Sequence, residues 1–264
     1  PAAVWHDEIS RHYPVRSILM AWGYRQKSAA GSMQIDSNFA SLAVRYKATL
    51  TPRAGGVYDW HAITVACETP VAACRCVNGD GGLMTYKNNG DGTWTFFFAL
   101  TFGTLTYWIF DRPQEGLPPG WGCRIRHPVT GAVTFDSRYN YIRPVQIVTS
   151  ANIDTDGAWS TNGVGDYACR YRDIGLTAGR TYAFVPMIYT CKHRLTYSRA
   201  PGGDESQYIS YYNLFQLVSR DLNGGIRLTE MDAAQVQLSG STVPFFVGPT
   251  RLAASAMLID VTNY

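Results

Sequence analysis

The chain has 264 residues, of which 46% are hydrophobic and 16% are charged, and its formal net charge is +3. This balance excludes an intrinsically disordered chain, because such chains carry few apolar residues and many charges. The small net charge and the lack of any long Lys/Arg run argue against a nucleic-acid-binding protein.

The first stretch of the sequence carries no recognisable targeting signal. Charged residues begin at His6, and no apolar segment followed by a cleavage site is present, so we expect folding in a reducing cytoplasm. Residues Asp7 to Met20 show only a broken helical pattern, which Pro14 interrupts. The most apolar stretch, Trp94 to Phe110, is too short for a membrane helix and rich in Thr and aromatic residues. It predicts two buried strands and no membrane span.

Short strands separated by turns account for most of the remaining chain. Gly, Asn, Asp and Pro, the residues that tight turns favour, cluster between the strands, as in Asn78–Gly82 and Asn89–Gly92. The predicted strands are Met33–Ile35, Ala40–Leu50, Ala62–Cys67, Thr93–Phe102, Leu105–Phe110, Cys123–His127, Val133–Asp136, Tyr141–Thr149, Thr181–Thr190, Tyr208–Val218, Thr242–Val247 and Ala256–Val261. Thr181–Ile188 is strongly apolar and is expected to be covered.

This pattern predicts an all-β fold, either a β-sandwich or an open barrel of short antiparallel strands, with at most one or two short helices. Thr229–Leu238 is the clearest helix candidate, because Thr229 would cap it and acidic residues follow in the first turn. We place a domain boundary near Ser150. Residues 1–149 then form a β-domain with two related hairpins, and residues 150–264 form a second β-rich region packing on it.

An internal repeat supports the β assignment. Residues Trp22 to Leu42 align with Trp121 to Ile142 after one insertion. Each copy predicts a strand, a tight turn at Gly31 or Gly131, and a second strand that ends in Asp-Ser. The Asp and Ser side chains are expected to accept hydrogen bonds from nearby backbone amides. These are Asp36 and Ser37 in the first copy, and Asp136 and Ser137 in the second.

No motif of an enzyme active site is present. The sequence lacks the spacing of a zinc protease, a nucleophile elbow or a P-loop. Asp36, Asp59, Asp111 and Asp136 lie at expected strand ends, but the repeat explains Asp36 and Asp136 as turn caps. We therefore predict that the chain is not an enzyme and has no catalytic, cofactor-binding or metal-binding residues. A cell-envelope hydrolase is the least favoured alternative.

The cysteines leave three alternatives open. A zinc site, a disulfide and buried free thiols all fit the spacing, and buried free thiols are favoured. The zinc site would use Cys67, Cys74, Cys76 and Cys123, and the disulfide would join Cys169 to Cys191.

The segment Asn152-x-Asp154-x-Asp156-Gly157 matches the opening of a calcium loop. The closing Glu of such a loop is absent, because Gly163 occupies its place. A polar turn is therefore the favoured interpretation.

Aromatic residues suggest binding surfaces. The run Tyr208–Phe215 is apolar on both faces of a strand, so it predicts either a central strand or one covered by a partner. Trp159 and Tyr167, beside the polar loop, would stack on sugars if the chain were a receptor-binding or carbohydrate-binding module.

The repeat and the C-terminal residues also carry a family resemblance. The segments that carry it are Trp121–Arg126 with Gly131 and Thr134–Arg143, the segment Gln34–Ala43, and the ending Met257–Tyr264. They are similar to motifs of minor tail proteins of long-tailed bacteriophages. The chain departs from that pattern at Cys123, where Leu is usual, and at Pro144 inside the last strand of the motif.

The resemblance implies a virion protein of the tail tip or baseplate, assembled in the host cytoplasm. Its implied partners are other phage tail proteins, namely hub, distal tail or tail-tube proteins, in a symmetric assembly of multiple copies. It also implies host cell-surface contact, and it carries over no catalytic residue and no cofactor.

Overall fold

The computed structural model describes residues 25–27, 33–36, 40–52, 59–115, 120–162, 169–188, 192–199, 208–222, 225–238 and 253–264. Within them the chain is all-β, as predicted, with strands and no helix. No described segment forms a helix with the length and apolar character needed to cross a bilayer. The helix candidate Asp7–Met20 and the predicted strand Thr242–Val247 lie outside the described residues.

Eighteen strands are described, and every pairing between them is antiparallel. They are β1 (Arg25–Lys27), β2 (Met33–Asp36), β3 (Ala43–Leu50), β4 (Asp59–Ala66), β5 (Val71–Val77), β6 (Gly81–Asn88), β7 (Thr93–Leu100), β8 (Thr104–Asp111), β9 (Arg124–Arg126), β10 (Val133–Asp136), β11 (Pro144–Ser150), β12 (Ser160–Asn162), β13 (Cys169–Gly175), β14 (Tyr182–Ile188), β15 (Lys192–Arg199), β16 (Tyr208–Leu222), β17 (Gly225–Leu238) and β18 (Ala254–Asp260).

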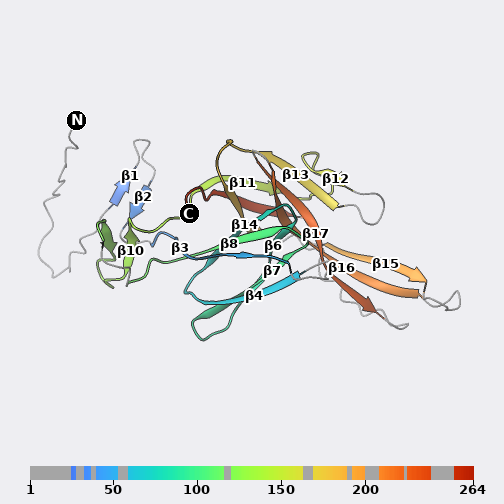
Figure 1. Ribbon diagram of the computed structural model, residues 1–264, viewed down its shortest axis with the longest axis horizontal. Coiled ribbons are helices and arrows are strands. Elements are labelled where there is room, and N and C mark those ends of the chain that lie inside the picture. The colour runs from blue at the N-terminus through green and yellow to red at the C-terminus, as the bar shows by residue number, and fades with distance from the viewer. Residues whose placement is uncertain are drawn as a thin grey trace, which may run out of the picture.

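Two sheets make up the body of the molecule (Figure 1). The six-stranded sheet has the order β11-β18-β14-β5-β8-β3. The eight-stranded sheet has the order β12-β13-β17-β16-β6-β7-β4, with β15 pairing to β16. Strands from before and after residue 150 therefore share both sheets.

The core lies between the two sheets. Phe96 and Phe98 of β7 pack in one cluster with Ile109 of β8, Phe184 of β14 and Leu258 of β18, and all five are buried. Burying such side chains contributes about 1.5–3 kcal/mol each. The apolar stretch from Trp94 to Phe110 does form two largely buried strands, β7 and β8, as predicted.

The six-stranded sheet is apolar on its outer face as well. Trp108, Phe110 and Ile259 form a second cluster there, against which Leu42 and Tyr264 pack. Alternate residues of β8 therefore face different clusters, which explains a strand with no polar face. The predicted cover of Thr181–Ile188 is confirmed over Tyr182–Val185, which is buried in β14.

The predicted helix at Thr229–Leu238 is wrong, because these residues belong to β17. The register joins β17 to β16 from Gly225 to Leu238, and its first part also pairs with β13. The hairpin pairing with β16 and the long-range pairing with β13 outweigh a local capping signal, which is a weak predictor of secondary structure.

Candidate interaction surface

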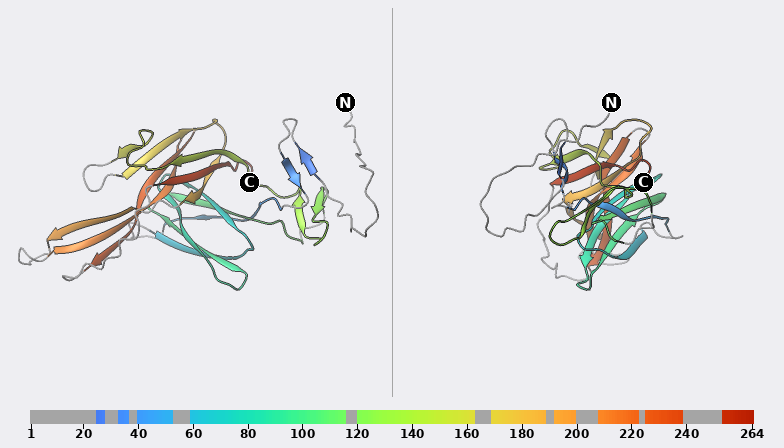
Figure 2. Two further views of the ribbon diagram at one scale, coloured as in Figure 1. Left: turned by 180° about the vertical axis from the view of Figure 1, so that it is seen from behind. Right: turned by 90° about the vertical axis from the view of Figure 1, so that its left-hand side faces the viewer.

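The two copies of the repeat form two separate hairpins at one end of the molecule. Figure 2 shows β1–β2 and β9–β10 beside each other, away from the body. The register pairs Arg25 with Asp36 in one hairpin and Arg124 with Asp136 in the other. Both registers shift by one residue at equivalent positions of the repeat, Gln34 and Thr134. The turn of the second copy needs a glycine, since Gly131 has a φ of 72°.

The Asp-Ser pair of the second hairpin acts as the predicted turn cap. The Asp136 carboxylate accepts hydrogen bonds from the backbone N–H and the Nε of Arg138, at 3.1 and 2.8 Å. Ser137 Oγ accepts a hydrogen bond of 2.8 Å from the backbone N–H of Cys123, which ties the second strand back to the first. The equivalent side chains of β2 lie outside the described residues.

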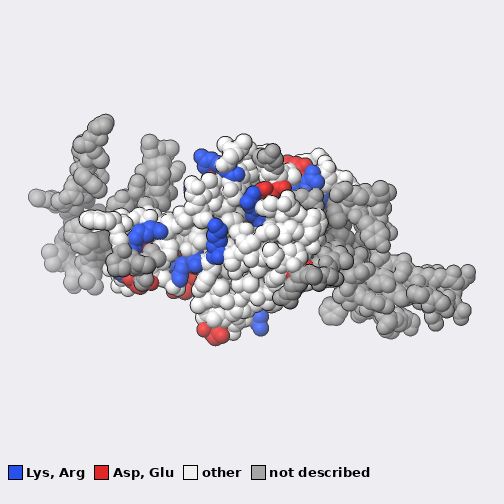
Figure 3. Space-filling model, viewed as in Figure 1, with Lys and Arg blue, Asp and Glu red and all other residues white. Residues whose placement is uncertain are grey.

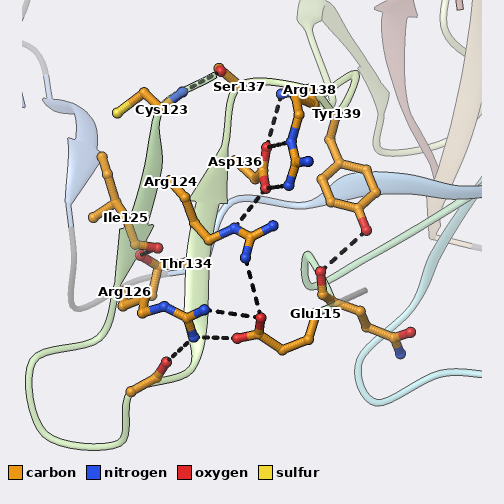
Figure 4. Close-up of polar contacts among 12 residues, drawn as sticks. Glu115, Cys123, Arg124, Ile125, Arg126, Thr134, Asp136, Ser137, Arg138 and Tyr139 are labelled. Carbon is orange, nitrogen blue, oxygen red and sulfur yellow. Dashed lines mark hydrogen bonds and ion pairs between the residues drawn. The ribbon is translucent and has the colours of Figure 1, made fainter. Parts of the chain in front are cut away.

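A buried carboxylate between two arginines fixes this hairpin (Figure 4). Asp136 is 1% exposed, and the Nε atoms of Arg124 and Arg138 lie 2.9 and 2.8 Å from its oxygens. The hydrogen bonds from the Arg138 side chain hold the pKa of Asp136 far below its ordinary value, although burial opposes this. The carboxylate is therefore ionised whenever the protein is folded near neutral pH.

Glu115 extends the charge network to the outer edge of the hairpin. Its carboxylate accepts hydrogen bonds from both terminal nitrogens of Arg126, and Arg124 Nη1 lies 3.4 Å away. The Arg126 side chain lowers the pKa of Glu115 through these bonds. Because Glu115 is more than half exposed, this outer part of the network contributes less to stability than the buried Asp136.

The aromatic residues of the motif pack inward against the same hairpin. The rings of Phe135 and Tyr141 stack with centroids 4.9 Å apart, and the Tyr141 hydroxyl donates a 2.9 Å hydrogen bond to the carbonyl of Asp136. Burial raises the pKa of Tyr141 to about 12, so the hydroxyl remains a donor. The Tyr141 side chain thus ties the end of β10 to the chain that follows it, through the Phe135 ring and the Asp136 carbonyl.

The linkers from the hairpins to the body bond to each other. Ser41 N–H donates to the carbonyl of Thr134, Val44 N–H to that of Asn140, and Ile142 N–H to that of Leu42, at 2.8–3.0 Å. These bonds align the chain that enters β3 with the chain that leaves β10.

Arg143 attaches the C-terminal segment to this linker. Its guanidinium stacks on the Tyr264 ring at 4.5 Å and donates a 2.6 Å hydrogen bond to the carbonyl of Thr262. The nearby Asp260 carboxylate is 4% exposed and also binds Arg180 at 2.5 Å. Burial opposes the ionisation of Asp260, but hydrogen bonds from Thr262 and Arg180 lower its pKa to about 2.

Asp260→Asn is expected to lower the free energy of unfolding by about 2 kcal/mol at pH 7. The folded pKa of about 2 lies below the unfolded value of about 3.9, so the stabilisation is complete above about pH 5 and is lost as the pH falls towards 2. Urea titrations at several pH values between 2 and 7 would measure this loss. Asp173→Asn is the control, because Asp173 pairs with Arg227 at the surface. Equal effects of the two variants at pH 7 would contradict the assignment.

Several apolar side chains of the hairpin remain exposed. Trp121, just before β9, is fully exposed, and Val129 in the turn is 78% exposed. Ile125 and Val133 are buried, yet they belong to neither cluster of the body, so the hairpin end has packing of its own. A fixed hairpin that presents an exposed Trp is typical of a protein contact surface.

The described cysteines do not form the zinc site that the spacing left open as an alternative. Cys67, Cys74 and Cys76 are buried free thiols, as favoured, whereas Cys123 is exposed on the hairpin. No cluster of three or more metal-ligating side chains occurs among the described residues. The side chains of Cys169 and Cys191 lie outside the described part of the chain.

The suspected calcium loop is a polar turn. Asn152 Oδ1 accepts a hydrogen bond from the backbone N–H of Asp154, and Asp156 Oδ1 accepts one from Ala158, both at 2.9 Å. The Asp154 carboxylate lies 3.4 Å from Arg170. The Asn152 and Asp156 oxygens thus accept hydrogen bonds from the loop's own backbone, and the Asp154 carboxylate pairs with Arg170 of β13.

The expected sugar-stacking role of Trp159 is wrong. Trp159 is 4% exposed and packs in the core, so its ring is not available to a ligand. Tyr167 and the side chains of the aromatic run Tyr208–Phe215 lie outside the described residues. The backbone of that run does occupy an inner strand, β16, between β15 and β17.

The described carboxylates that were candidates for acid–base chemistry have other partners. Asp111 accepts hydrogen bonds from the backbone N–H groups of Glu68 and Thr69, and Asp59 lies 3.1 Å from His61 Nε2. Trp121 belongs to the sequence repeat, but nothing in the sequence showed that its side chain would be exposed, and Glu115 carried no recognisable motif. In comparisons with known proteins, no family model, no curated protein and no solved structure matches the chain.

Proposed function

We propose that the chain is a structural protein of a bacteriophage tail tip or baseplate, and that it binds other tail proteins through the β9–β10 hairpin. It acts in multiple copies of a symmetric assembly, is built in the host cytoplasm, and aids attachment to the host surface. The proposal assigns it no reaction and no cofactor. It rests on the similarity of the repeat to tail-protein motifs and on one structural observation, the fixed hairpin with an exposed Trp121.

The physical case concerns the cost of association. A surface that is already ordered loses little conformational entropy when a partner binds, and aromatic residues dominate the binding energy of many protein interfaces. Asp136 and Tyr141 order the hairpin, and Trp121 supplies the exposed aromatic side chain. On the face in Figure 3, Lys and Arg side chains are scattered rather than gathered in one basic patch, which supports protein rather than nucleic acid as the partner.

Immunogold labelling of purified particles of the virus that encodes the chain would test the proposed location. We expect an antibody against the chain to label the distal end of the tail. Absence of the chain from purified virions would reject a structural role. Release of soluble fragments from peptidoglycan or capsule by the purified chain would instead support a hydrolase.

Trp121→Ala is expected to reduce incorporation of the chain into tails at least tenfold, because it removes the exposed aromatic side chain and leaves the hairpin's hydrogen bonds in place. Quantitative immunoblotting of virions from complemented mutants would measure incorporation. Trp60→Ala is the matched control, because Trp60 is 42% exposed on β4, outside the hairpin. Equal incorporation of the two variants would reject the hairpin as the contact.

A further inference from the structure

A shallow groove of about 470 Å³ opens at the end of the body that bears the turn between β6 and β7. Its lining includes Cys67, Glu68, Asn88, Gly92, Trp94 and Gln114. Three separate segments supply these residues: the turn after β4, the β6–β7 hairpin, and the chain just after β8. The volume falls within the range of about 300–1,000 Å³ that is usual for ligand sites.

Hydrogen bonds within and between these segments hold the groove in shape. Cys67 N–H donates to the carbonyl of Gly92 at 3.1 Å, which joins the turn after β4 to the β6–β7 hairpin. The Asp111 carboxylate accepts the backbone N–H of Glu68 at 2.8 Å. Asn88 Oδ1 accepts the backbone N–H of Gly90 at 2.8 Å, which fixes the hairpin turn. A ligand would therefore meet a surface that is already ordered.

The lining combines one aromatic wall with several short polar side chains. Trp94 is partly buried against the core, and the Tyr86 ring lies 5.8 Å from it. Glu68 supplies carboxylate oxygens, and Asn88 and Gln114 supply amide groups. Both Glu68 and Gln114 are exposed, and each already contacts an arginine: Arg112 pairs with the Glu68 carboxylate, and Arg45 donates to Gln114 Oε1. A ligand would therefore meet these polar groups together with their arginine partners.

The charges around the groove balance, so no net charge draws an anionic or a cationic ligand. The Glu68 carboxylate lies 3.3 Å from Arg112 Nη1. Arg45, which donates a hydrogen bond to Gln114 Oε1, offsets the buried Asp111. The Cys67 thiol stays neutral, since burial raises its pKa to about 12. The three polar side chains equally disfavour a purely apolar ligand, which would strip them of water without replacing the hydrogen bonds.

We propose that this groove binds a neutral saccharide. The C–H face of a sugar ring packs on an aromatic ring, and its hydroxyls both donate and accept hydrogen bonds. In the groove Trp94 provides the ring, Glu68 accepts from sugar hydroxyls, and the amides of Asn88 and Gln114 meet the remaining ones. This site goes beyond the proposed function, because the hairpin binds its partner whether or not the groove is occupied.

The test is binding of the purified full-length chain to an array of neutral and acidic oligosaccharides, followed by calorimetric titration of the best neutral binder. We expect binding of neutral sugars only. Trp94→Ala is expected to weaken sugar binding at least tenfold. Trp60→Ala is expected to leave sugar binding unchanged, because Trp60 lies on β4, the edge strand next to β7, and does not line the groove. Glu68→Gln and Gln114→Ala are expected to weaken binding three- to tenfold. Both residues are exposed, so these variants remain informative if loss of Trp94 impairs folding.

Three results would overturn the saccharide site. They are the absence of binding to any sugar on the array, a preference for acidic sugars, and sugar binding that neither Glu68→Gln nor Gln114→Ala weakens. Loss of tail incorporation in Trp121→Ala with unchanged sugar binding would separate this site from the hairpin contact, as would the reverse pattern in Trp94→Ala.

Discussion

Asp136→Asn is expected to lower the free energy of unfolding by about 3 kcal/mol at pH 7. The substitution keeps the size of the side chain but removes the charge that pairs with Arg124 and Arg138. Both arginines are themselves largely covered, with side-chain exposures of 30% and 20%, so they would lose a partner that water replaces only in part. Urea unfolding followed by tryptophan fluorescence would measure the global effect.

Hydrogen exchange of the backbone amides in β9 and β10 would show whether the loss begins in the hairpin. We expect their protection to fall more than that of β7 and β8. Glu115→Gln is the control, since this carboxylate belongs to the same network but is 58% exposed and should change stability little. If both variants behaved alike, the buried carboxylate would not be what holds the hairpin.

Gly103→Ala is expected to cost about 4 kcal/mol of stability, through backbone strain and a steric clash together. Gly103 lies in the turn between β7 and β8 with a φ of 82°, which disfavours any side chain. An added Cβ would also lie 2.2 Å from the carbonyl oxygen of Val77, the last residue of β5, and 2.7 Å from the carbonyl carbon of Asn78 in the turn that follows. The two turns are joined by the hydrogen bond from Thr101 N–H to the carbonyl of Asp80, so neither is free to move.

Gly179→Ala separates the two contributions. Gly179 has a similar φ of 78°, but no atom lies within 4 Å of the position that its Cβ would take. We expect this variant to lose about 1 kcal/mol, the cost of the backbone conformation alone. Thermal and urea denaturation of the two variants would give the difference, and equal losses would show that the turn packing adds nothing.

The sequence predicted the strands whose residues alternate or form apolar runs, and it missed those defined only by their partners. Val133–Asp136 was predicted with its observed bounds, and Thr93–Phe102 differs from β7 by two residues at one end. β5 contains two alanines and two cysteines, and its sequence indicated only a cluster of thiols. β6 begins with two glycines, which resemble a turn. β5 is central because it pairs with β8 and β14, which lie further along the chain, and no local pattern reports that pairing. β6 pairs with β7 across the turn at Asn89–Gly92 and meets the distant β16 at Gly81.

The candidate surface was only half predictable. The Asp-Ser cap and the turn at Gly131 follow from local chemistry, so the repeat predicted them correctly. Glu115 reaches Arg126 across the chain from a segment with no strand signal, and this depends on tertiary structure. Trp159 illustrates the opposite error, since an aromatic residue beside a polar loop gives no local sign of being buried.

The paired linkers have a mechanical consequence. If the hairpin end is anchored and the body is pulled, both paired linkers carry the tension. One is the segment that enters β3, and the other is the segment that joins β10 to β11. The hydrogen bonds of Ser41, Val44 and Ile142 hold the two segments side by side, so the hairpin end cannot bend away from the body on one segment alone without breaking them. Arg143 and Tyr264 tie a third segment to the same place. The joint is thus expected to resist bending between the hairpin end and the body.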